Sequence, residues 1–513
     1  MKRGVRQGCP LSMLLYTLVA ETIGNAIDAD SNIRGAQTPG GKGEHKKVQF
    51  ADDTNGIVRD TPSIYALFDL FQRYEAGTGA RLCIHKTRGI SINHKGDDPC
   101  RDIPILWNKS DTKILGVIFT ADLNMAAKLN WDRITKAVAS KSKAMSKRVL
   151  SLRAKALLAN TLVLSKTWHV GRIFMPTQSI EKKLDASVFP FIWGGTQELI
   201  SRTNLKLPLR QGGINLLPIR TQCIALQLQD LLKIESDVGP NWVSYFRYWL
   251  GDGLSTLRDG WKKFRNNSVP KHVIGKKPEH HREILNHAKT VVPNLSESSR
   301  SAQSIRRKIG HSIGPTENAL SARKHIQRLS KCTISWDNVF KNLYLDAIPA
   351  RHCEIRLKLS HNALQTNANL AKWLKKEGGG CMKCGNTEDA IHVFMCESFS
   401  DLRLEILEIL KPVIKPGINF LDLIFCKVEH PLVQAIVAET MHIMWISRCR
   451  SQHEGKKPNC KSLLAKVVCK VKDGLKQLPN AAIYKCQIFD ARLRSLTIPM
   501  LTAQADSWAF DNG

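Results

Sequence analysis

The chain contains 513 residues, which is enough for roughly two to four domains with proper cores. Hydrophobic residues make up 43% of it, so the composition excludes a disordered protein. Lysine and arginine number 76 against 45 acidic residues, and the formal charge of +31 indicates a polyanionic partner, with nucleic acid first and an anionic membrane second. A merely soluble basic surface is the alternative.

Membrane and secretion signals are not found in the sequence. No apolar run approaches the ~20 residues that a membrane span needs. No signal-peptide core follows the first residues, so we expect an intracellular protein, nuclear or cytoplasmic, that is not secreted and has no membrane partner. The 14 cysteines favour a reducing compartment, with free thiols and one metal site.

The first predicted elements are a helix and a β-hairpin. Apolar residues recur at helical spacing for about 18 residues from Pro10, whose missing N–H suits a first helical turn. A short apolar strand, Val48–Ala51, leads to Asp52 and Asp53, and residues 56–58 form the expected return strand. Two adjacent carboxylates on a rigid tip could hold a hard divalent cation through oxygen ligands. Alternatively, this stretch is only a turn, because Asp, Asn and Gly favour turns.

Two motifs in this region carry a family resemblance. The block Gly-Val-Arg-Gln-Gly-Cys-Pro-Leu-Ser at residues 4–12 and the Phe-Ala-Asp-Asp box at residues 50–53 together resemble the palm of a reverse transcriptase of the non-LTR (LINE-type) retrotransposon family. The resemblance implies that Asp52 and Asp53 are catalytic and bind magnesium. Met13 departs from the family, which usually has proline at this place. The implied template and nucleotide pocket is shaped by Gly4, Gln7, Gly8 and Ser12.

A second amphipathic helix and a lysine-bearing segment follow. The helix spans Thr61–Glu75, with Gly77 as its expected C-cap. Residues 79–87 then resemble a family segment that has a lysine at the position of Lys86. A lysine facing substrate can have a shifted pKa and act as an acid, which the resemblance implies for Lys86. A solvated loop lysine is the alternative.

The primer grip and the thumb follow by the same resemblance. Residues 113–119 are a short apolar strand that matches the family's primer-grip hairpin, with Leu115 and Gly116 at the usual places. Residues 131–170 predict two helices separated near Ser151, which by resemblance form the thumb along the primer–template duplex. Basic side chains facing phosphates would give salt-sensitive affinity, whereas a solvated helix face is the alternative. These side chains are Lys128, Arg133, Lys136, Lys141, Lys143, Lys147, Arg148, Arg153 and Lys155.

Beyond the thumb the sequence changes character. The family resemblance continues through Phe-Ile-Trp-Gly-Gly at residues 191–195 to Gly212 and Gly213, which predict a turn between packed elements. The aromatic cluster at residues 242–249 favours a buried helix surface over a base-stacking platform. Residues 262–331 lose apolar periodicity and gain Pro, Ser, His, Lys and Arg, so we expect a basic, partly flexible linker.

A second chemical site is predicted at four ligand-competent residues: Cys381, Cys384, His392 and Cys396. Three thiolates and one imidazole complete a tetrahedral zinc shell, so the ion would be structural, whereas coincidental core cysteines are the alternative. Members of the same family often carry such a Cys-x-x-Cys…His…Cys element downstream of the thumb. Nucleic-acid docking around this site is expected through Lys372, Lys375, Lys376 and Lys383.

The resemblance also implies parts that this sequence lacks. In the family, the magnesium cage needs a third aspartate, on a strand that precedes the block at residues 4–12, and the nucleotide-binding fingers lie upstream as well. Only Met1–Arg3 precede that block here, and Asp69 lies on the second predicted helix and does not replace the missing aspartate. We therefore expect a truncated polymerase, inactive alone, which binds deoxynucleotide triphosphates only if the upstream part is supplied.

The expected fold class is α+β, with a partial polymerase palm sheet with helices, followed by a mainly α-helical thumb and a C-terminal region with a small zinc knuckle. The predicted regions are a partial palm (1–122), a thumb-like helical region (123–235), a basic linker (236–332), a zinc-knuckle region (333–400) and a helical C-terminal region (401–513). The implied function is RNA-directed DNA polymerase, with RNA and DNA as partners and Mg²⁺ and Zn²⁺ as cofactors. The alternatives are a zinc-dependent nucleic-acid-binding protein and a non-functional relic of a retroelement.

Overall fold

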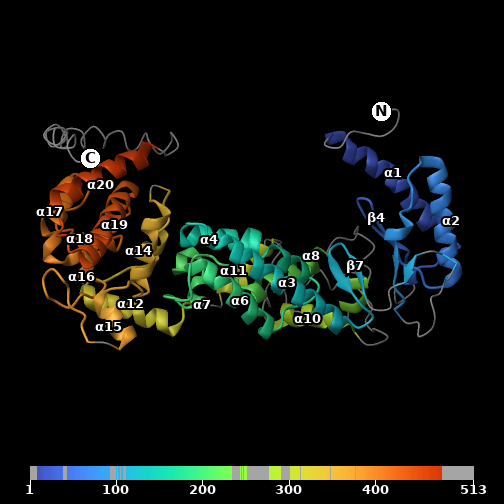
Figure 1. Ribbon diagram of the computed structural model, residues 1–513, viewed down its shortest axis with the longest axis horizontal. Coiled ribbons are helices and arrows are strands. Elements are labelled where there is room, and N and C mark those ends of the chain that lie inside the picture. Colours follow the sequence, from blue (N-terminus) through green and yellow to red (C-terminus); the bar gives the residue numbers. More distant parts are fainter. Residues whose placement is uncertain are drawn as a thin grey trace. The chain divides into compact units, whose positions relative to one another are not determined.

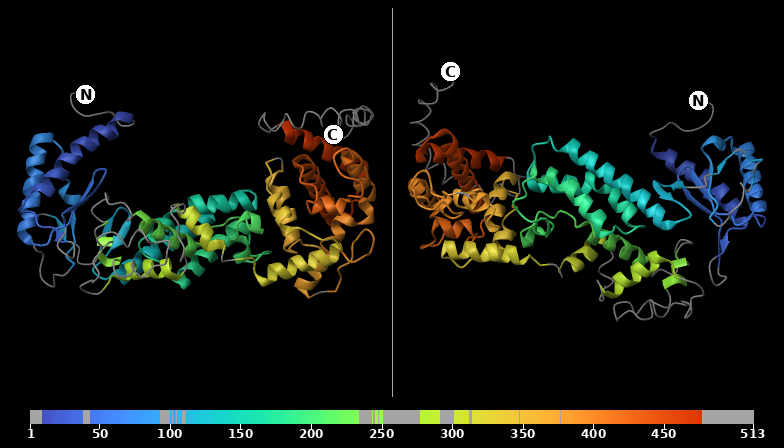
Figure 2. Two further views of the ribbon diagram at one scale, coloured as in Figure 1. Left: turned by 180° about the vertical axis from the view of Figure 1, so that it is seen from behind. Right: turned by 60° about the horizontal axis from the view of Figure 1, so that its bottom comes forward.

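The computed structural model is mostly helical, with a few short strands (Figures 1 and 2). It describes residues 9–37, 43–92, 100, 102–103, 105–107, 111–233, 243, 245–246, 248–250, 277–290, 301–311, 314–346, 348–375 and 377–476. Among these residues, no helix combines the length and the apolar character that crossing a membrane requires.

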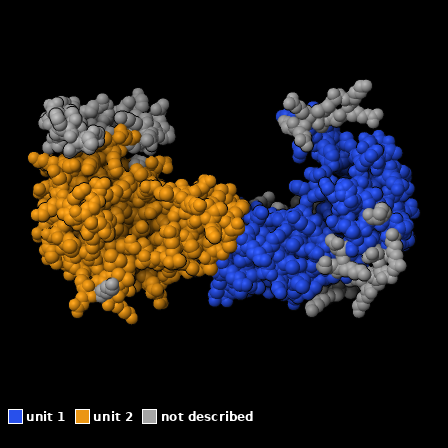
Figure 3. Space-filling view, viewed as in Figure 1, with its two compact units in different colours: residues 1–138, 165–184, 219–311 blue, residues 139–164, 185–218, 312–513 orange. Residues whose placement is uncertain are grey.

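Internal contacts divide the chain into two compact units (Figure 3). The first comprises Met1–Val138, Ser165–Leu184 and Ile219–His311, and the second comprises Ala139–Leu164, Asp185–Pro218 and Ser312–Gly513. Each unit therefore combines segments that are distant in the sequence. The division into five regions stays a prediction.

A small apolar core joins the first two helices of the first unit. These are α1 (Pro10–Ala29) and α2 (Thr61–Thr78). Ile23 and Ile27 of α1 are buried in this core, and the Asp60 side chain caps the start of α2. The predicted end of α2 was wrong, because Gly77 lies inside the helix. The C-cap is Gly79 at φ +75°, where the chain adopts the left-handed conformation that glycine favours.

Among the described residues, every sheet has only two strands. The pairs are β1 (Ala36–Gln37) with β2 (Glu44–His45), β3 (Lys47–Phe50) with β4 (Asp53–Gly56), β5 (Arg88–Gly89) with β6 (Leu106–Trp107), and β7 (Thr112–Ile114) with β8 (Val117–Phe119). The return strand of the Asp-Asp hairpin thus begins at Asp53 and ends at Gly56, where it was expected to begin. Residues 113–119 form a hairpin and not one strand. A polymerase palm sheet, and with it the α+β class, stays a prediction.

The predicted thumb is helical, and its break lies at Ser151. Its elements are α3 (Leu123–Met145), α4 (Leu152–Leu158), a short π-helix η2 (Ala159–Val163) and α5 (Ser165–Gly171). Next come α6 (Gln178–Trp193), α7 (Arg202–Leu205), η3 (Leu209–Gln211) and α8 (Ile219–Lys233). Ser151 accepts the backbone N–H of Ala154 and caps α4. The predicted packed turn is confirmed at Gly213, where a Cβ would lie 2.0 Å from the carbonyl oxygen of Leu207.

Helices occupy much of the described part of the predicted linker. They are α10 (Glu279–Thr290), α11 (Ala302–His311) and α12 (Glu317–Ser330). Ile284 of α10 and Ile305 of α11 are fully buried in an apolar core with Leu228 of α8. The linker prediction was wrong here, because a few apolar anchors suffice to pack each helix and the many basic residues between them hide the periodicity. Tyr248 is buried and Phe246 packs against this core, as predicted; Trp242 lies outside the described residues.

The C-terminal half of the second unit is built around one long helix, α19. Its helices are α13 (Trp336–Lys341), α14 (Ala350–Ser360), α15 (Asn367–Leu374), α16 (His392–Met395), η6 (Glu397–Phe399), α17 (Ser400–Leu410), α18 (Phe420–Ile424), α19 (Pro431–Glu454) and α20 (Cys460–Lys476). Helices α14, α16, α18 and α20 all contact α19. Buried residues lie on every side of α19, as in a helix enclosed by others.

Candidate metal centre and the polymerase-like motifs

The first pair of predicted metal ligands lies on a tight loop between α15 and α16. The carbonyl of Cys381 accepts the backbone N–H of Gly385 at 2.8 Å, and its own N–H donates to Asn386 at 2.7 Å. These bonds close a turn that contains Cys384. Gly385 has φ +77°, which glycine adopts without steric cost, so it allows this tight turn.

The second pair of ligands flanks the single turn of α16. His392 is its first residue, and Cys396 follows its last residue. The Asp389 carboxylate starts this turn, because its Oδ1 accepts the backbone N–H groups of Ile391 and His392, each at 2.8 Å. The N–H of Cys396 donates to the carbonyl of His392 at 2.7 Å. One helical turn therefore brings the imidazole and the thiol together.

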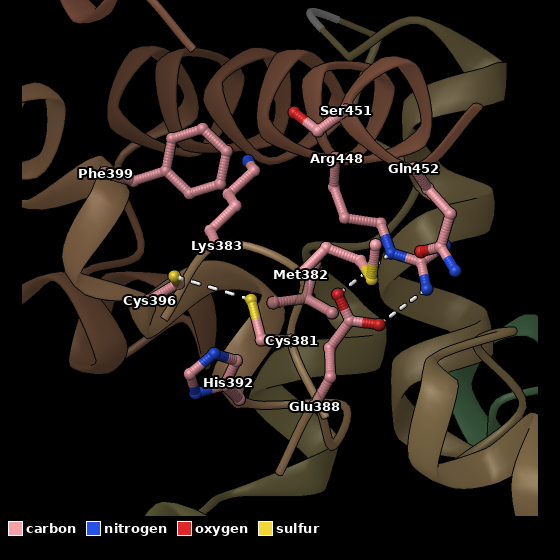
Figure 4. A pocket seen from close by; sticks show the side chains of 11 residues that line it. Cys381, Met382, Lys383, Glu388, His392, Cys396, Phe399, Arg448, Ser451 and Gln452 are labelled. Atoms are coloured by element: carbon pink, nitrogen blue, oxygen red, sulfur yellow. Dashed lines mark hydrogen bonds and ion pairs between the residues drawn. The ribbon is translucent and has the colours of Figure 1, made fainter. Parts of the chain in front are cut away.

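The four side chains converge with spacings that suit a zinc ion, and Figure 4 shows three of them, Cys381, His392 and Cys396. The Sγ of Cys396 lies 3.9 Å from that of Cys381 and 3.8 Å from that of Cys384. The Sγ of Cys384 lies 3.3 Å from Nε2 of His392. Zn–S bonds of about 2.3 Å in a tetrahedron place sulfur atoms about 3.8 Å apart. The cluster could therefore hold a zinc ion with only small adjustments.

Burial and hydrogen bonds set the protonation of the thiols. Cys381 and Cys396 are buried, with 6% and 2% of their surface exposed. Desolvation raises the pKa of Cys384 to about 11. Desolvation also acts to raise the pKa of Cys396, but hydrogen bonds with Ser398 and the neighbouring thiols outweigh it and lower this pKa. Because zinc binds thiolates, metal binding at this site would release protons.

A buried ion pair and a stacked lysine line the pocket beside the cysteines (Figure 4). Arg448 of α19 donates to Glu388, on the loop between the two ligand pairs, at 3.1 and 2.5 Å. Lys383 lies over the ring of Phe399, with Nζ 4.0 Å from the ring centroid, and desolvation lowers its pKa. Lys383 therefore stacks inside the protein, and the expectation that it contacts nucleic acid was wrong. Lys372 and Lys375 are exposed, and Lys376 lies outside the described residues.

The Asp-Asp pair lies at the tip of the β3–β4 hairpin. Phe50 pairs with Asp53, so Ala51 and Asp52 form a two-residue turn, with Ala51 at φ +52°. Both carboxylates are exposed. Burial and, to a smaller extent, the charge of Asp52 raise the pKa of Tyr16 on α1. Within the described residues, no third His, Cys, Asp or Glu joins the pair in a metal-binding cluster.

The other palm-like residues are only partly described. Gly4, Gln7 and Gly8 lie outside the described residues. Ser12 lies half-buried in the first turn of α1, where its backbone N–H donates to the carbonyl of Cys9. Lys86 is the exposed last residue of the short 3₁₀ helix η1 (Ile84–Lys86). The pocket and the acid role implied by the resemblance therefore stay predictions.

The predicted primer-grip residues form the turn of the β7–β8 hairpin. Leu115 and Gly116 have φ values of +46° and +86°. The carbonyl of Leu115 accepts a hydrogen bond from Nε2 of His169 at 2.9 Å, and the carbonyl of Gly116 accepts one from the guanidinium of Arg133. The buried amide of Asn130 also bonds both backbone groups of Ile118. Helices α3 and α5 therefore fix the position of this turn.

Comparison with known proteins gives one informative similarity. No family model matches the chain. It is 29% identical over 246 residues to the "Transposon TX1 uncharacterized 149 kDa protein" of Xenopus laevis. The match covers 47% of this chain and 18% of the relative, so it spans less than a fifth of the relative's length. The similarity supports a retrotransposon origin, in agreement with the resemblance of the motifs, and is compatible with nucleic-acid partners.

Sequence reasoning missed residues whose partners are distant in the chain. Arg133 was expected to face phosphate, yet its guanidinium holds the β7–β8 turn. Lys155 is buried and donates to the carbonyl of Ile192 at 3.2 Å, so it also does not face phosphate. A second cluster of potential ligands, His352, Glu439 and His442, also went unnoticed. Its one sequence signal is the Glu-x-x-His spacing on a predicted helix.

Proposed function

We propose that the chain is part of a LINE-type (non-LTR) retrotransposon reverse transcriptase, that it binds RNA and DNA, and that a zinc ion stabilises its second unit. The Cys₃His cluster carries this proposal, because its sulfur and nitrogen spacings suit a tetrahedral ion. The similarity to the Xenopus laevis transposon protein and the formal charge of +31 support it independently.

The proposed phosphate-binding surface is a stripe of exposed lysines on α3. Lys128, Lys136 and Lys143 are exposed and follow one another at intervals of two helical turns, so they lie on one face. Lys147 and Arg148 extend the exposed positive charge just beyond the helix. Basic side chains in such a row neutralise successive phosphates without reading the sequence.

Binding of fluorescent RNA and DNA by the full chain, measured by anisotropy at several salt concentrations, tests the proposal. We expect log K to fall linearly with log salt, and Lys136→Gln to lower the slope on duplex DNA by about 0.9 for its one phosphate contact. Lys411→Gln is the control, because this exposed lysine lies far along the sequence and pairs with Glu408. Salt-insensitive binding would contradict the proposal.

The zinc part of the proposal has its own variant. Cys384→Ser removes one ligand, so we expect loss of bound zinc and weaker nucleic-acid binding. Cys469→Ser is the matched control, because Cys469 is exposed and lies outside the cluster. If Cys384→Ser and removal of zinc by a chelator both leave binding unchanged, the centre has no part in nucleic-acid binding.

A second candidate function is magnesium-dependent polymerisation, favoured by the two exposed carboxylates on the β3–β4 tip. Two-metal phosphoryl transfer needs carboxylates on both ions, and no further ligand joins Asp52 and Asp53 among the described residues. We therefore expect no primer extension on an RNA template by this chain alone. Extension that Asp52→Ala abolishes and Asp69→Ala leaves intact would instead establish polymerase activity.

A further inference from the structure

Helices α14 and α19 bring together three metal-competent side chains away from the Cys₃His cluster. His352 lies on α14, and Glu439 and His442 lie three positions apart on α19, hence on one face of that helix. Their ligand atoms all lie within 4.8 Å of one another. The rings of His352 and His442 stack with centroids 4.0 Å apart, and Nδ1 of His352 lies 3.0 Å from Oε2 of Glu439.

Several polar atoms of this cluster are buried without hydrogen-bond partners. His352 and Glu439 expose only 8% and 3% of their surface. Three buried atoms lack any hydrogen bond: Nδ1 of His352, Oε1 of Glu439 and Nδ1 of His442. The 3.0 Å approach of His352 to Glu439 therefore does not have hydrogen-bond geometry. Buried polar atoms are costly when they are unsatisfied, so three of them in one cluster require an explanation.

We propose that His352, Glu439 and His442 bind a second divalent transition-metal ion, with zinc as the first candidate. Two imidazoles and one carboxylate are a zinc ligand set that leaves the fourth position of the tetrahedron for water. Ligand atoms about 2.1 Å from such an ion lie about 3.4 Å apart, close to the observed spacings.

An ion-pair network is the competing explanation. Nζ of Lys470, on α20, lies 3.6 Å from Oε1 of Glu439. This ammonium can neutralise the carboxylate, but it leaves the Nδ1 atoms of both histidines without a partner. The Lys470 side chain is 53% exposed, so it can turn into water when an ion neutralises Glu439. The metal ion accounts for all three unpaired atoms, whereas the lysine accounts for one.

Metal content of the full chain tests this inference. The protein is stripped with a chelator, dialysed against zinc and analysed for bound zinc per chain by mass spectrometry. We expect two ions in the unmodified chain, one in His442→Gln, one in Cys384→Ser and none in the double variant. His453→Gln, which changes an exposed histidine of the same helix, is the control and should keep two. A single ion in the unmodified chain, or two in His442→Gln, would overturn the inference.

Cobalt separates loss of the second site from misfolding. Thiolate ligands give Co²⁺ an intense sulfur-to-metal absorption, which histidine and carboxylate ligands do not. His442→Gln should therefore keep this absorption at full strength while losing one equivalent of metal. The variant Lys470→Met should still bind two ions. If Lys470→Met and His442→Gln both lose one equivalent of metal, the loss comes from disturbed packing of α20 on α19, and the assignment of His442 as a ligand is overturned.

Discussion

Replacing Arg448 by methionine removes one partner of a buried ion pair beside the Cys₃His cluster. Its guanidinium donates to both carboxylate oxygens of Glu388 and, at 2.9 Å, to Oδ1 of Asn367. The side chains of Arg448 and Glu388 expose only 8% and 3% of their surface. Glu388 lies between Cys384 and His392 in the sequence, so the pair ties the metal-binding loop to α19.

The expected loss of stability comes from the carboxylate of Glu388, which stays buried after its partner is removed. Removing one partner of a buried ion pair typically destabilises a protein by about 3–5 kcal/mol, because the remaining carboxylate is desolvated and unpaired. For a urea dependence of about 2 kcal/mol per molar, the unfolding midpoint of the second unit should fall by about 1.5–2.5 M. Arg450→Met, at an exposed position of the same helix, should change the stability by less than about 0.5 kcal/mol.

Release of zinc from the Cys₃His cluster, followed with a colour-forming chelator across a urea series, reports this local unfolding. The double variant Arg448→Met, Glu388→Gln provides the decisive comparison. Because it removes both charges, we expect it to recover most of the loss caused by Arg448→Met alone. If the double variant instead loses the sum of the two single losses, the two side chains act independently and the reasoning from a buried pair is refuted.

Three further outcomes are expected. Asn130→Ala should cost about 2–4 kcal/mol and speed hydrogen exchange at the Ile118 amide, because both backbone groups of Ile118 lose their partner. Gly213→Ala should destabilise by about 3 kcal/mol or more, since its Cβ would meet a carbonyl oxygen at 2.0 Å, whereas Gly195→Ala meets nothing within 4 Å and should be close to neutral in thermal melts. Desolvation lowers the pKa of His361 from 6.5 to about 4, so the unfolded chain takes up the proton first; stability should fall as the pH drops from 6.5 towards 4, and the slope should be shallower in His361→Gln.

The sequence predicts features that depend on neighbouring residues. The break at Ser151 is predicted from the sequence and is confirmed, because the Ser151 side chain caps α4. The Cys₃His ligands are also visible in the sequence, because two short loops carry all four. Contacts between distant segments are invisible to such reasoning. The bond from His169 to the Leu115 carbonyl and the meeting of His352 with α19 depend on how helices pack.

The positive charge of the chain divides into two groups with different roles. Lys155 and Arg448 are buried and bond a carbonyl or a carboxylate inside the protein, and Lys383 stacks on an aromatic ring. Such side chains contribute to the formal charge of +31 but cannot release counterions from nucleic acid. Lysines such as Lys136 and Lys143, by contrast, have exposed side chains that phosphates can reach. Substituting the buried group should therefore lower stability with little change in the salt dependence of binding, whereas substituting the exposed group should lower that salt dependence and leave stability unchanged.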